Sequence, residues 1–260
     1  MLQLTAEPRR PSGDAAADTA AVLRRLLGAC PDLRITPVAQ RPAGGGWCSG
    51  PELALRAEEL VAAEADRIEA LHGTRPARHV AASLLLHHYL WSVCLLVAGP
   101  WYLDGLVVRP DPAALWIDTA TGDLALGPVR AAPLGGPDEV REAVAAHCGP
   151  VLAAFRPLVR RGPHALWGLV GDDLASALSY LGRALGDEDR AVAAAEAVLP
   201  GGTAPFPGAA GFRRLAADDG SLHWTRTRHG CCLYYAVRPA EACLTCPRTC
   251  DAERRRRLAP

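Results

Sequence analysis

Residues 81–98 have the sequence AASLLLHHYLWSVCLLVA, which is the longest apolar stretch in this chain of 260 residues. Its length approaches that of a membrane span, but His87 and His88 lie at its centre and Gly99-Pro100 follows its end. Core helices of globular proteins are apolar on all sides, whereas membrane spans rarely carry paired histidines. We therefore expect a buried central helix over about residues 76–98, and at most a peripheral association with membranes.

Helical periodicity continues on both sides of this stretch. Apolar residues recur every three or four positions after Thr19 and again after Ser49, where Ser49 and Glu52 form a capping-box pattern. Further helices are expected over 137–147, 149–159, 163–185 and 188–199. Short β-branched runs at 103–108, 115–118 and 124–126 predict a small antiparallel sheet of two or three strands. The fold class is therefore α+β and mostly helical: a helical bundle with a small antiparallel sheet.

The chain divides by composition into four parts. Residues 1–18 lack an apolar core and are expected to be disordered, and residues 19–200 form the α-rich domain, with its sheet at about 103–126. The turn-rich run Pro200–Pro205 then precedes a C-terminal segment at 209–250. Residues 251–260 form a basic tail, whose Arg254–Arg257 run is expected to be a solvated charge run.

Composition excludes several functions. The chain has no lysine, and its 28 arginines balance 28 acidic residues. A P-loop lysine and a Schiff-base lysine are thus excluded, and no basic patch or helix-turn-helix pattern suggests nucleic-acid binding. Residues 1–18 also carry charges where a secretory signal needs an apolar core, so we expect a cytoplasmic protein.

Five of the nine cysteines gather in twenty residues near the end of the chain. Cys231, Cys232, Cys243 and Cys246 have the spacing C-C-x10-C-x2-C, and Cys250 follows. Disulfides are rare in the cytosol, which leaves a thiolate-bound metal. Neighbouring Cα atoms are about 3.8 Å apart and extended side chains alternate in direction, so Cys231 and Cys232 suit a binuclear iron–sulfur cluster better than one zinc ion. Cys94, by contrast, lies in an apolar helix and is expected to pack in the core.

The C-terminal motif resembles that of the ferric-siderophore reductases of the FhuF type. The matching residues are Cys231, Cys232, Cys243 and Cys246, with the run HGCCLYYAVR at 229–238 and Pro247 after the last cysteine. Ala81-Ala-Ser83 and Leu166-Trp-Gly168 are weaker points of similarity. The stretch 238–242 departs from the family because it lacks glycine, and Cys250 is extra. Cys250 could replace Cys246 as a ligand, which is the second-ranked arrangement.

This resemblance implies a [2Fe–2S] cluster bound by Cys231, Cys232, Cys243 and Cys246. It implies the one-electron reduction of a ferric siderophore, which releases Fe(II) because ferrous ion is held more weakly by oxygen ligands. The chain has no nucleotide-binding fingerprint, so a separate electron donor, a ferredoxin or a reductase, is expected. A zinc-stapled interaction module without redox activity is the alternative, and an iron or oxygen sensor is a third possibility that would need a DNA-binding element.

Several neighbours of the motif have a structural and a functional interpretation. Arg226, Arg228, Arg238 and Arg248 are each expected at the solvated surface, although as a group they could guide an anionic chelate. His223 and His229 could be hydrogen-bond donors to the ligands. The aromatic residues considered as walls of a substrate site, with core packing as the simpler alternative, are Trp101, Tyr102, Trp167, Tyr234 and Tyr235.

Overall fold

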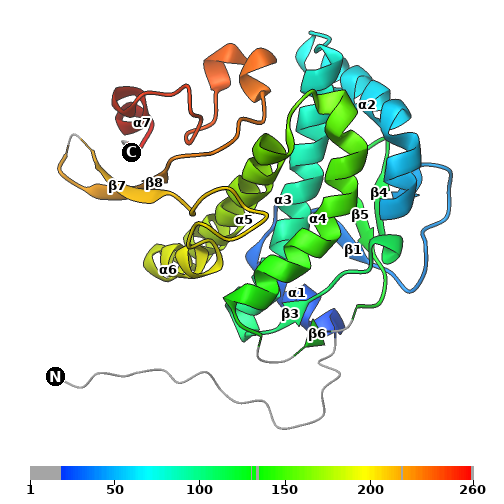
Figure 1. Ribbon diagram of the computed structural model, residues 1–260, viewed down its shortest axis with the longest axis horizontal. Helices are drawn as coiled ribbons and strands as arrows, with labels where there is room; N and C mark the ends of the chain where they lie inside the picture. The colour runs from blue at the N-terminus through cyan, green and yellow to red at the C-terminus, as the bar shows by residue number, and fades with distance from the viewer. Residues whose placement is uncertain (1–18, 130, 133–134, 218, 259–260) are drawn as a thin grey trace.

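The computed structural model describes residues 19–129, 131–132, 135–217 and 219–258, and the predicted disordered segment 1–18 lies outside them. The described residues form a mostly helical α+β fold, as the sequence predicts (Figure 1). Its seven α-helices within these ranges are α1 (Thr19–Ala29), α2 (Gly50–His72), α3 (Arg78–Asp104), α4 (Pro137–Val159), α5 (Pro163–Leu185), α6 (Glu188–Val198) and α7 (Asp251–Leu258).

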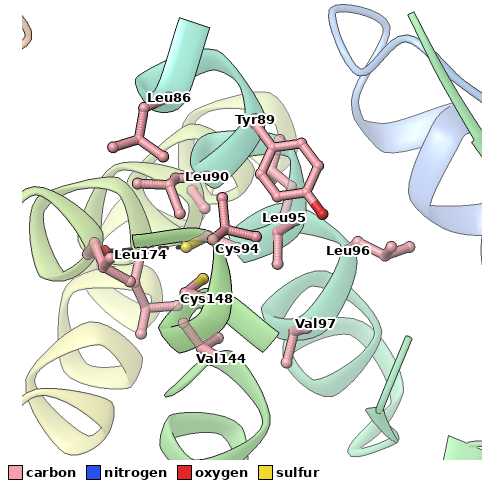
Figure 2. Packing of buried hydrophobic residues seen from close by; sticks show 14 of the residues in the cluster. Leu86, Tyr89, Leu90, Cys94, Leu95, Leu96, Val97, Val144, Cys148 and Leu174 are labelled. Atoms are coloured by element: carbon pink, nitrogen blue, oxygen red, sulfur yellow. Dashed lines mark hydrogen bonds between the residues drawn. The ribbon is translucent and has the colours of Figure 1, made fainter. Parts of the chain in front are cut away.

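Helix α3 is the centre of the fold, with α2, α4 and α5 packed against it. The side chains from Val93 to Ala98 are fully buried, because this helix is apolar around its whole circumference. Figure 2 shows Cys94 of α3 near Cys148 of α4 in this core, where both are free thiols. By length and composition α3 could cross a membrane, but most of its apolar window is buried inside the protein. The prediction of a buried central helix is confirmed.

Two helices run through prolines at which the sequence predicts an end. Helix α3 continues past Pro100 to Asp104 and ends at Gly105, which adopts the left-handed conformation with φ 71°. Helix α4 is one continuous helix through Gly149-Pro150, where two separate helices are expected. In both helices, buried residues on either side of the proline keep the same face in the core, and this packing outweighs the missing backbone hydrogen bond.

The sheet beside α2 and α4 has the strand order β1-β5-β4-β2. Its strands are β1 (Ile35–Pro37), β2 (Trp47–Ser49), β4 (Leu115–Asp118) and β5 (Leu124–Leu126). The predicted β4–β5 pair is confirmed, with Leu115 opposite Leu126. Strand β1 pairs in parallel with β5, while the other pairings are antiparallel. The predicted strand at 103–108 shrinks to β3 (Val107–Val108), which pairs with β6 (Ala131–Ala132) rather than with this sheet.

Helix α2 begins as its capping box predicts. The carboxylate of Glu52 accepts hydrogen bonds from the backbone N–H and the hydroxyl of Ser49 at 2.7 and 2.8 Å. Cys48 lies one residue earlier in strand β2 and is buried. Helix α2 ends at His72, whose ring packs edge to face against Tyr234 of the C-terminal segment.

A hairpin of β7 (Phe212–Ala216) and β8 (Leu222–Arg226) leads from the helical body to the cysteines (Figure 1). Two short 3-10 helices, η2 (Tyr234–Ala236) and η3 (Pro239–Glu241), lie between the two cysteine pairs. Helix α7 then returns to the hairpin, where Asp251 makes a two-point ion pair with Arg213 at 2.6 and 3.0 Å. The C-terminal segment is thereby attached at both its beginning and its end.

Candidate metal centre

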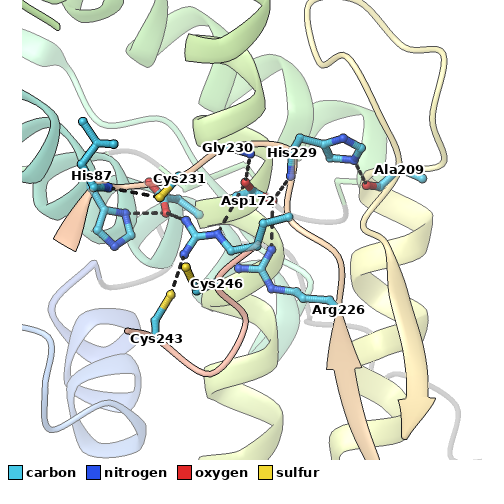
Figure 3. A network of polar contacts seen from close by, with 12 residues as sticks. His87, Asp172, Ala209, Arg226, His229, Gly230, Cys231, Cys243 and Cys246 are labelled. Carbon is cyan, nitrogen blue, oxygen red and sulfur yellow. Dashed lines mark hydrogen bonds and ion pairs between the residues drawn. The ribbon is translucent and has the colours of Figure 1, made fainter. Parts of the chain in front are cut away.

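The four predicted ligand residues lie in two short loops that fold against α5. Cys231 and Cys232 follow β8, and Cys243 and Cys246 enclose a tight turn in which the N–H of Cys246 donates to the carbonyl of Cys243 at 2.9 Å. Figure 3 shows the thiol groups of Cys231, Cys243 and Cys246 directed toward the same region beside α5. The structure therefore brings together residues that are fifteen positions apart.

The thiols of the two loops lie close enough to change each other's pKa. The neighbouring thiol of Cys243, followed by burial, raises the pKa of Cys232, and burial raises the pKa of Cys231. Sγ of Cys231 also accepts from the N–H of Leu233 at 3.4 Å. Within the described ranges, no three His, Cys, Asp or Glu side chains converge closely enough to hold a single metal ion.

Burial differs among the five cysteines of this region. Cys232 and Cys246 are buried, Cys231 and Cys243 are half-buried, and Cys250 is exposed. A group held by the first four would thus lie at the edge of the protein, with one side toward the helical body and one toward solvent. Cys250 lies outside this arrangement, at the start of α7.

Arg228 joins the cysteines to the helical body. Its Nη1 donates to Sγ of Cys243 at 3.7 Å, and its Nε and Nη2 lie 3.5 Å from Asp172 and 3.8 Å from Asp173. Burial alone would lower the pKa of Arg228, but Asp173, Asp172 and Cys243 raise it. Conversely, the hydrogen bond from Cys232, followed by Arg228, lowers the pKa of Cys243. Both pKa shifts favour a charged guanidinium at Arg228 and a thiolate at Cys243. The thiolate is the form of cysteine that binds metal.

Asp172 of α5 anchors the loop that carries the first cysteine pair. Its carboxylate accepts from the backbone N–H groups of His229 at 3.1 Å and Gly230 at 2.6 Å, and from Arg226 Nη1 at 3.2 Å. A Cβ at Gly230 would lie 3.3 Å from both Asp172 Oδ2 and the backbone nitrogen of Leu169. Glycine at this position lets the loop approach α5 closely enough for these bonds to form. Burial raises the pKa of Asp172, although Arg226 and Arg228 act against this rise.

Asp173 extends the network to α3. It is fully buried, and its Oδ1 lies 2.7 Å from Nδ1 of His87. Among the described residues, Nε and Nη2 of Arg228 and both oxygens of Asp173 form no hydrogen bond, since their ion-pair contacts are too long or poorly angled. The third nitrogen, Nη1, donates to Sγ of Cys243, and such a charged donor beside the thiols suits the sulfur ligands of an anionic cluster. The residues present therefore fit a thiolate-ligated iron–sulfur cluster.

The structure corrects four expectations about the neighbours of the motif. Arg226 and Arg228 are buried rather than solvated, because Asp172 and Asp173 pair with them from α5. His223 and His229 do not donate to the cysteines. The ring of His223 contacts the Ser221 hydroxyl, and the ring of His229 contacts the carbonyl of Ala209.

Arg254 also departs from the predicted solvated run. It is only 5% exposed, and its Nη2 donates to the carbonyl of Cys246 at 2.9 Å.

Three of the aromatic residues considered as walls of a substrate site pack away from the cysteines: Trp101 donates to the carbonyl of Gly135, Tyr102 contacts Arg190, and Trp167 packs on Phe206. Tyr234 and Tyr235 do lie in the cysteine segment, within η2.

The comparison with known families supports the iron–sulfur interpretation. Residues 228–248 match the family model of the FhuF 2Fe-2S C-terminal domain, and no curated protein matches the chain. The match begins at Arg228, includes both cysteine pairs and ends before Cys250. The resemblance to the FhuF type is thus confirmed over these residues, and with it the [2Fe–2S] cluster as the cofactor.

Proposed function

We propose that this protein is a ferric-siderophore reductase in which Cys231, Cys232, Cys243 and Cys246 hold the [2Fe–2S] cluster. The observation that carries this proposal is the match to the FhuF 2Fe-2S domain, over the same residues that gather four thiols at one edge of the protein. When bound, the cluster supplies one-electron transfer. The hard oxygen donors of siderophores hold Fe(III) more tightly than Fe(II), so one electron is enough to release the metal.

The surrounding residues support and orient this centre. Asp172 fixes the first cysteine loop and Arg254 fixes the second, while Arg228 adds a positive charge beside Cys243. Cys231 and Cys243 are half-buried, which leaves a route for electrons between the cluster edge and a molecule at the surface. We further propose a separate donor, a ferredoxin or a reductase, and a cytoplasmic location with at most peripheral contact with membranes.

Electron paramagnetic resonance of anaerobically purified protein tests the cofactor. The oxidised sample should be silent, and dithionite should produce a spin-half signal from a [2Fe–2S] centre. Absence of a signal in both states, together with zinc by elemental analysis, would overturn the proposal in favour of a zinc-stapled interaction module.

The reductase activity needs a second measurement. Dithionite-reduced protein, freed of excess dithionite, is mixed anaerobically with a ferric siderophore and a colorimetric Fe(II) chelator. One Fe(II) should appear for each reduced cluster that is reoxidised, and Cys243→Ser should abolish both changes. Protein that keeps its reduced signal in the presence of ferric siderophores would contradict the proposed activity. Consumption of NADPH by the isolated protein would contradict the separate donor.

A further inference from the structure

A groove of about 230 Å³ lies directly beside the second cysteine loop. One rim is formed by Leu244 and Thr245, the two residues between Cys243 and Cys246, and the other walls come from α3, α5, β7 and β8. A molecule in this groove would contact the two residues that lie between Cys243 and Cys246 in sequence. The groove is smaller than the roughly 300–1,000 Å³ typical of complete ligand sites, so it can enclose a single ring but not a whole siderophore.

Two aromatic pairs line the groove. Trp91 and Tyr180 meet edge to face at 5.5 Å with an interplanar angle of 82°, and Phe212 and Trp224 do so at 6.3 Å and 90°. Rings arranged in this way offer both faces and edges to a further planar ring. These side chains come from α3, α5 and the hairpin, which are distant in sequence.

Hydroxyl groups accompany these rings. Thr225 lines the groove and is 2% exposed, yet its Oγ1 has no hydrogen-bond partner among the described residues. Ser176 and Ser179 of α5 line the same space. A buried hydroxyl without a partner costs about 1–3 kcal/mol, so Thr225 is not explained by the stability of the fold. At the wall of this groove, its hydroxyl is free to pair with an oxygen atom of a ligand.

We propose that this groove binds an aryl arm of the ferric chelate, a catecholate or phenolate ring whose oxygen pairs with Thr225. The aromatic pairs would enclose the ring, and the iron at its oxygen end would lie toward Leu244 and Thr245, near Cys243. Arg183 lines the same groove; its side chain is half exposed, and its Nε is ion-paired with Glu188 at 2.9 Å. This inference rests on the proposed reductase function and assigns its substrate class.

Binding of redox-inert gallium(III) complexes to the cluster-loaded protein tests the groove separately from the electron transfer. The Ga(III) complex of a tris-catecholate chelator should bind at least tenfold more tightly than that of a tris-hydroxamate chelator. Thr225→Val should weaken catecholate binding about tenfold, the loss expected for a hydrogen bond to a charged oxygen. Thr225→Ser, which keeps the hydroxyl, should bind as the wild type does.

Thr203→Val is the matched control, because Oγ1 of Thr203 also lacks a partner but lies outside the groove. It should leave binding unchanged. The thermal midpoint of Thr225→Val should be no lower than that of the wild type, since the substitution removes an unsatisfied hydroxyl. Should Thr225→Val fail to fold, Trp224→Leu removes a half-buried ring from the wall of the same groove and should also weaken catecholate binding.

The two proposals fail in different ways. Equal affinity for the two gallium complexes, or unchanged catecholate binding in Thr225→Val and Trp224→Leu, would overturn the groove while leaving ferric reduction intact. Tight, Thr225-dependent binding of the gallium catecholate by a protein that reduces no ferric chelate would support the groove and overturn the reductase.

Discussion

Arg228 Nη1 lies 3.7 Å from Sγ of Cys243, while the other two nitrogens of the same guanidinium face Asp172 and Asp173. One buried cation thus contacts a proposed cluster ligand and two carboxylates of α5. A reduced cluster carries one more negative charge than an oxidised cluster, so a fixed cation at this distance favours the reduced state. The two carboxylates act in the opposite direction and hold the cation in place.

Replacement of Arg228 by glutamine should therefore lower the reduction potential of the cluster, because the reduced form loses more stabilisation than the oxidised form. Arg228→Lys should lie between this variant and the wild type, since it keeps the charge but not the planar fork. Redox titration followed by the spin-half signal measures the change. Arg238→Gln is the matched control, because Arg238 lies between the cysteine pairs but is half exposed and paired with Glu241.

Loss of Arg228 also removes one of the cations that face two buried carboxylates, leaving Arg226 beside Asp172 and His87 beside Asp173. Breaking such a pair costs about 3–5 kcal/mol, so Arg228→Gln should unfold at a lower denaturant concentration. The double variant Arg228→Gln/Asp173→Asn should regain part of that loss and move the potential back toward the wild-type value. A potential that stays constant across all of these variants would show that Arg228 acts only in folding.

Gly230→Ala should weaken the contact between the first cysteine loop and α5. The added Cβ would lie 3.3 Å from the backbone nitrogen of Leu169, which cannot move aside without disturbing the helix. Overpacking of this kind costs about 1–3 kcal/mol, and the displaced loop should bind less iron per chain. Unfolding curves and iron analysis measure both effects.

Gly28→Ala should have the opposite effect on stability, because an added Cβ has free space at this position. Gly28 is exposed in α1, and a Cβ there meets nothing within 4 Å. This substitution should stabilise the protein by about 0.5–1 kcal/mol through the lower entropy of the unfolded chain, with no change in iron content. Equal effects of the two substitutions would show that the approach of Gly230 to α5 is unimportant.

The elements that the sequence predicts well are those with a local pattern. The long apolar run of α3, the apolar periodicity of α5 and the capping box of α2 depend on neighbours along the chain, and so does the C-C-x10-C-x2-C spacing. Strands β1 and β2 are three residues long, too short to show a period of two. The predicted end of α3 and the predicted break within α4 are wrong because tertiary packing decides whether a helix continues through a proline.

The surroundings of the cysteines depend on contacts between distant segments. Asp172 and Asp173 follow Gly171 in an otherwise apolar helix, and two adjacent acidic residues at such a position were the available signal for a buried charge site. Their partners Arg226 and Arg228 lie more than fifty residues later. Charged residues are mostly exposed, so their burial follows only once α5 and the hairpin are known to meet.

The ligand assignment predicts a clear division among the cysteines. Replacing any one of Cys231, Cys232, Cys243 and Cys246 by serine should remove the visible absorption and the iron, because a lost thiolate leaves an iron without its ligand. Cys250→Ser should keep both, since Cys250 is exposed at the start of α7. A bleached Cys250→Ser variant beside a coloured Cys246→Ser variant would assign the fourth ligand to Cys250 instead.

A pH dependence of stability should arise in the core, away from the cysteines. His147 is 3% exposed, its Nδ1 lies 3.3 Å from the carbonyl oxygen of Pro110, and its Nε2 lies 2.8 Å from the hydroxyl of Tyr89. A carbonyl only accepts, so Nδ1 bears the proton and Nε2 accepts from Tyr89. The neutral ring is fully satisfied in this arrangement, and burial lowers the pKa of His147 below its ordinary value of 6.5.

The sign of the effect follows from proton uptake. Below about pH 6.5 the unfolded chain protonates this histidine while the folded chain does not, so the free energy of unfolding falls as the solution becomes more acidic. One such group contributes at most about 1.4 kcal/mol for each pH unit, and its full contribution is present above pH 7. Denaturant unfolding at pH 7.5, 6.5 and 5.5 should show a shallower fall for His147→Gln than for the wild type. His164→Gln, at an exposed position of α5, controls for the loss of a histidine, and an equal fall in all three proteins would exclude His147 as the source.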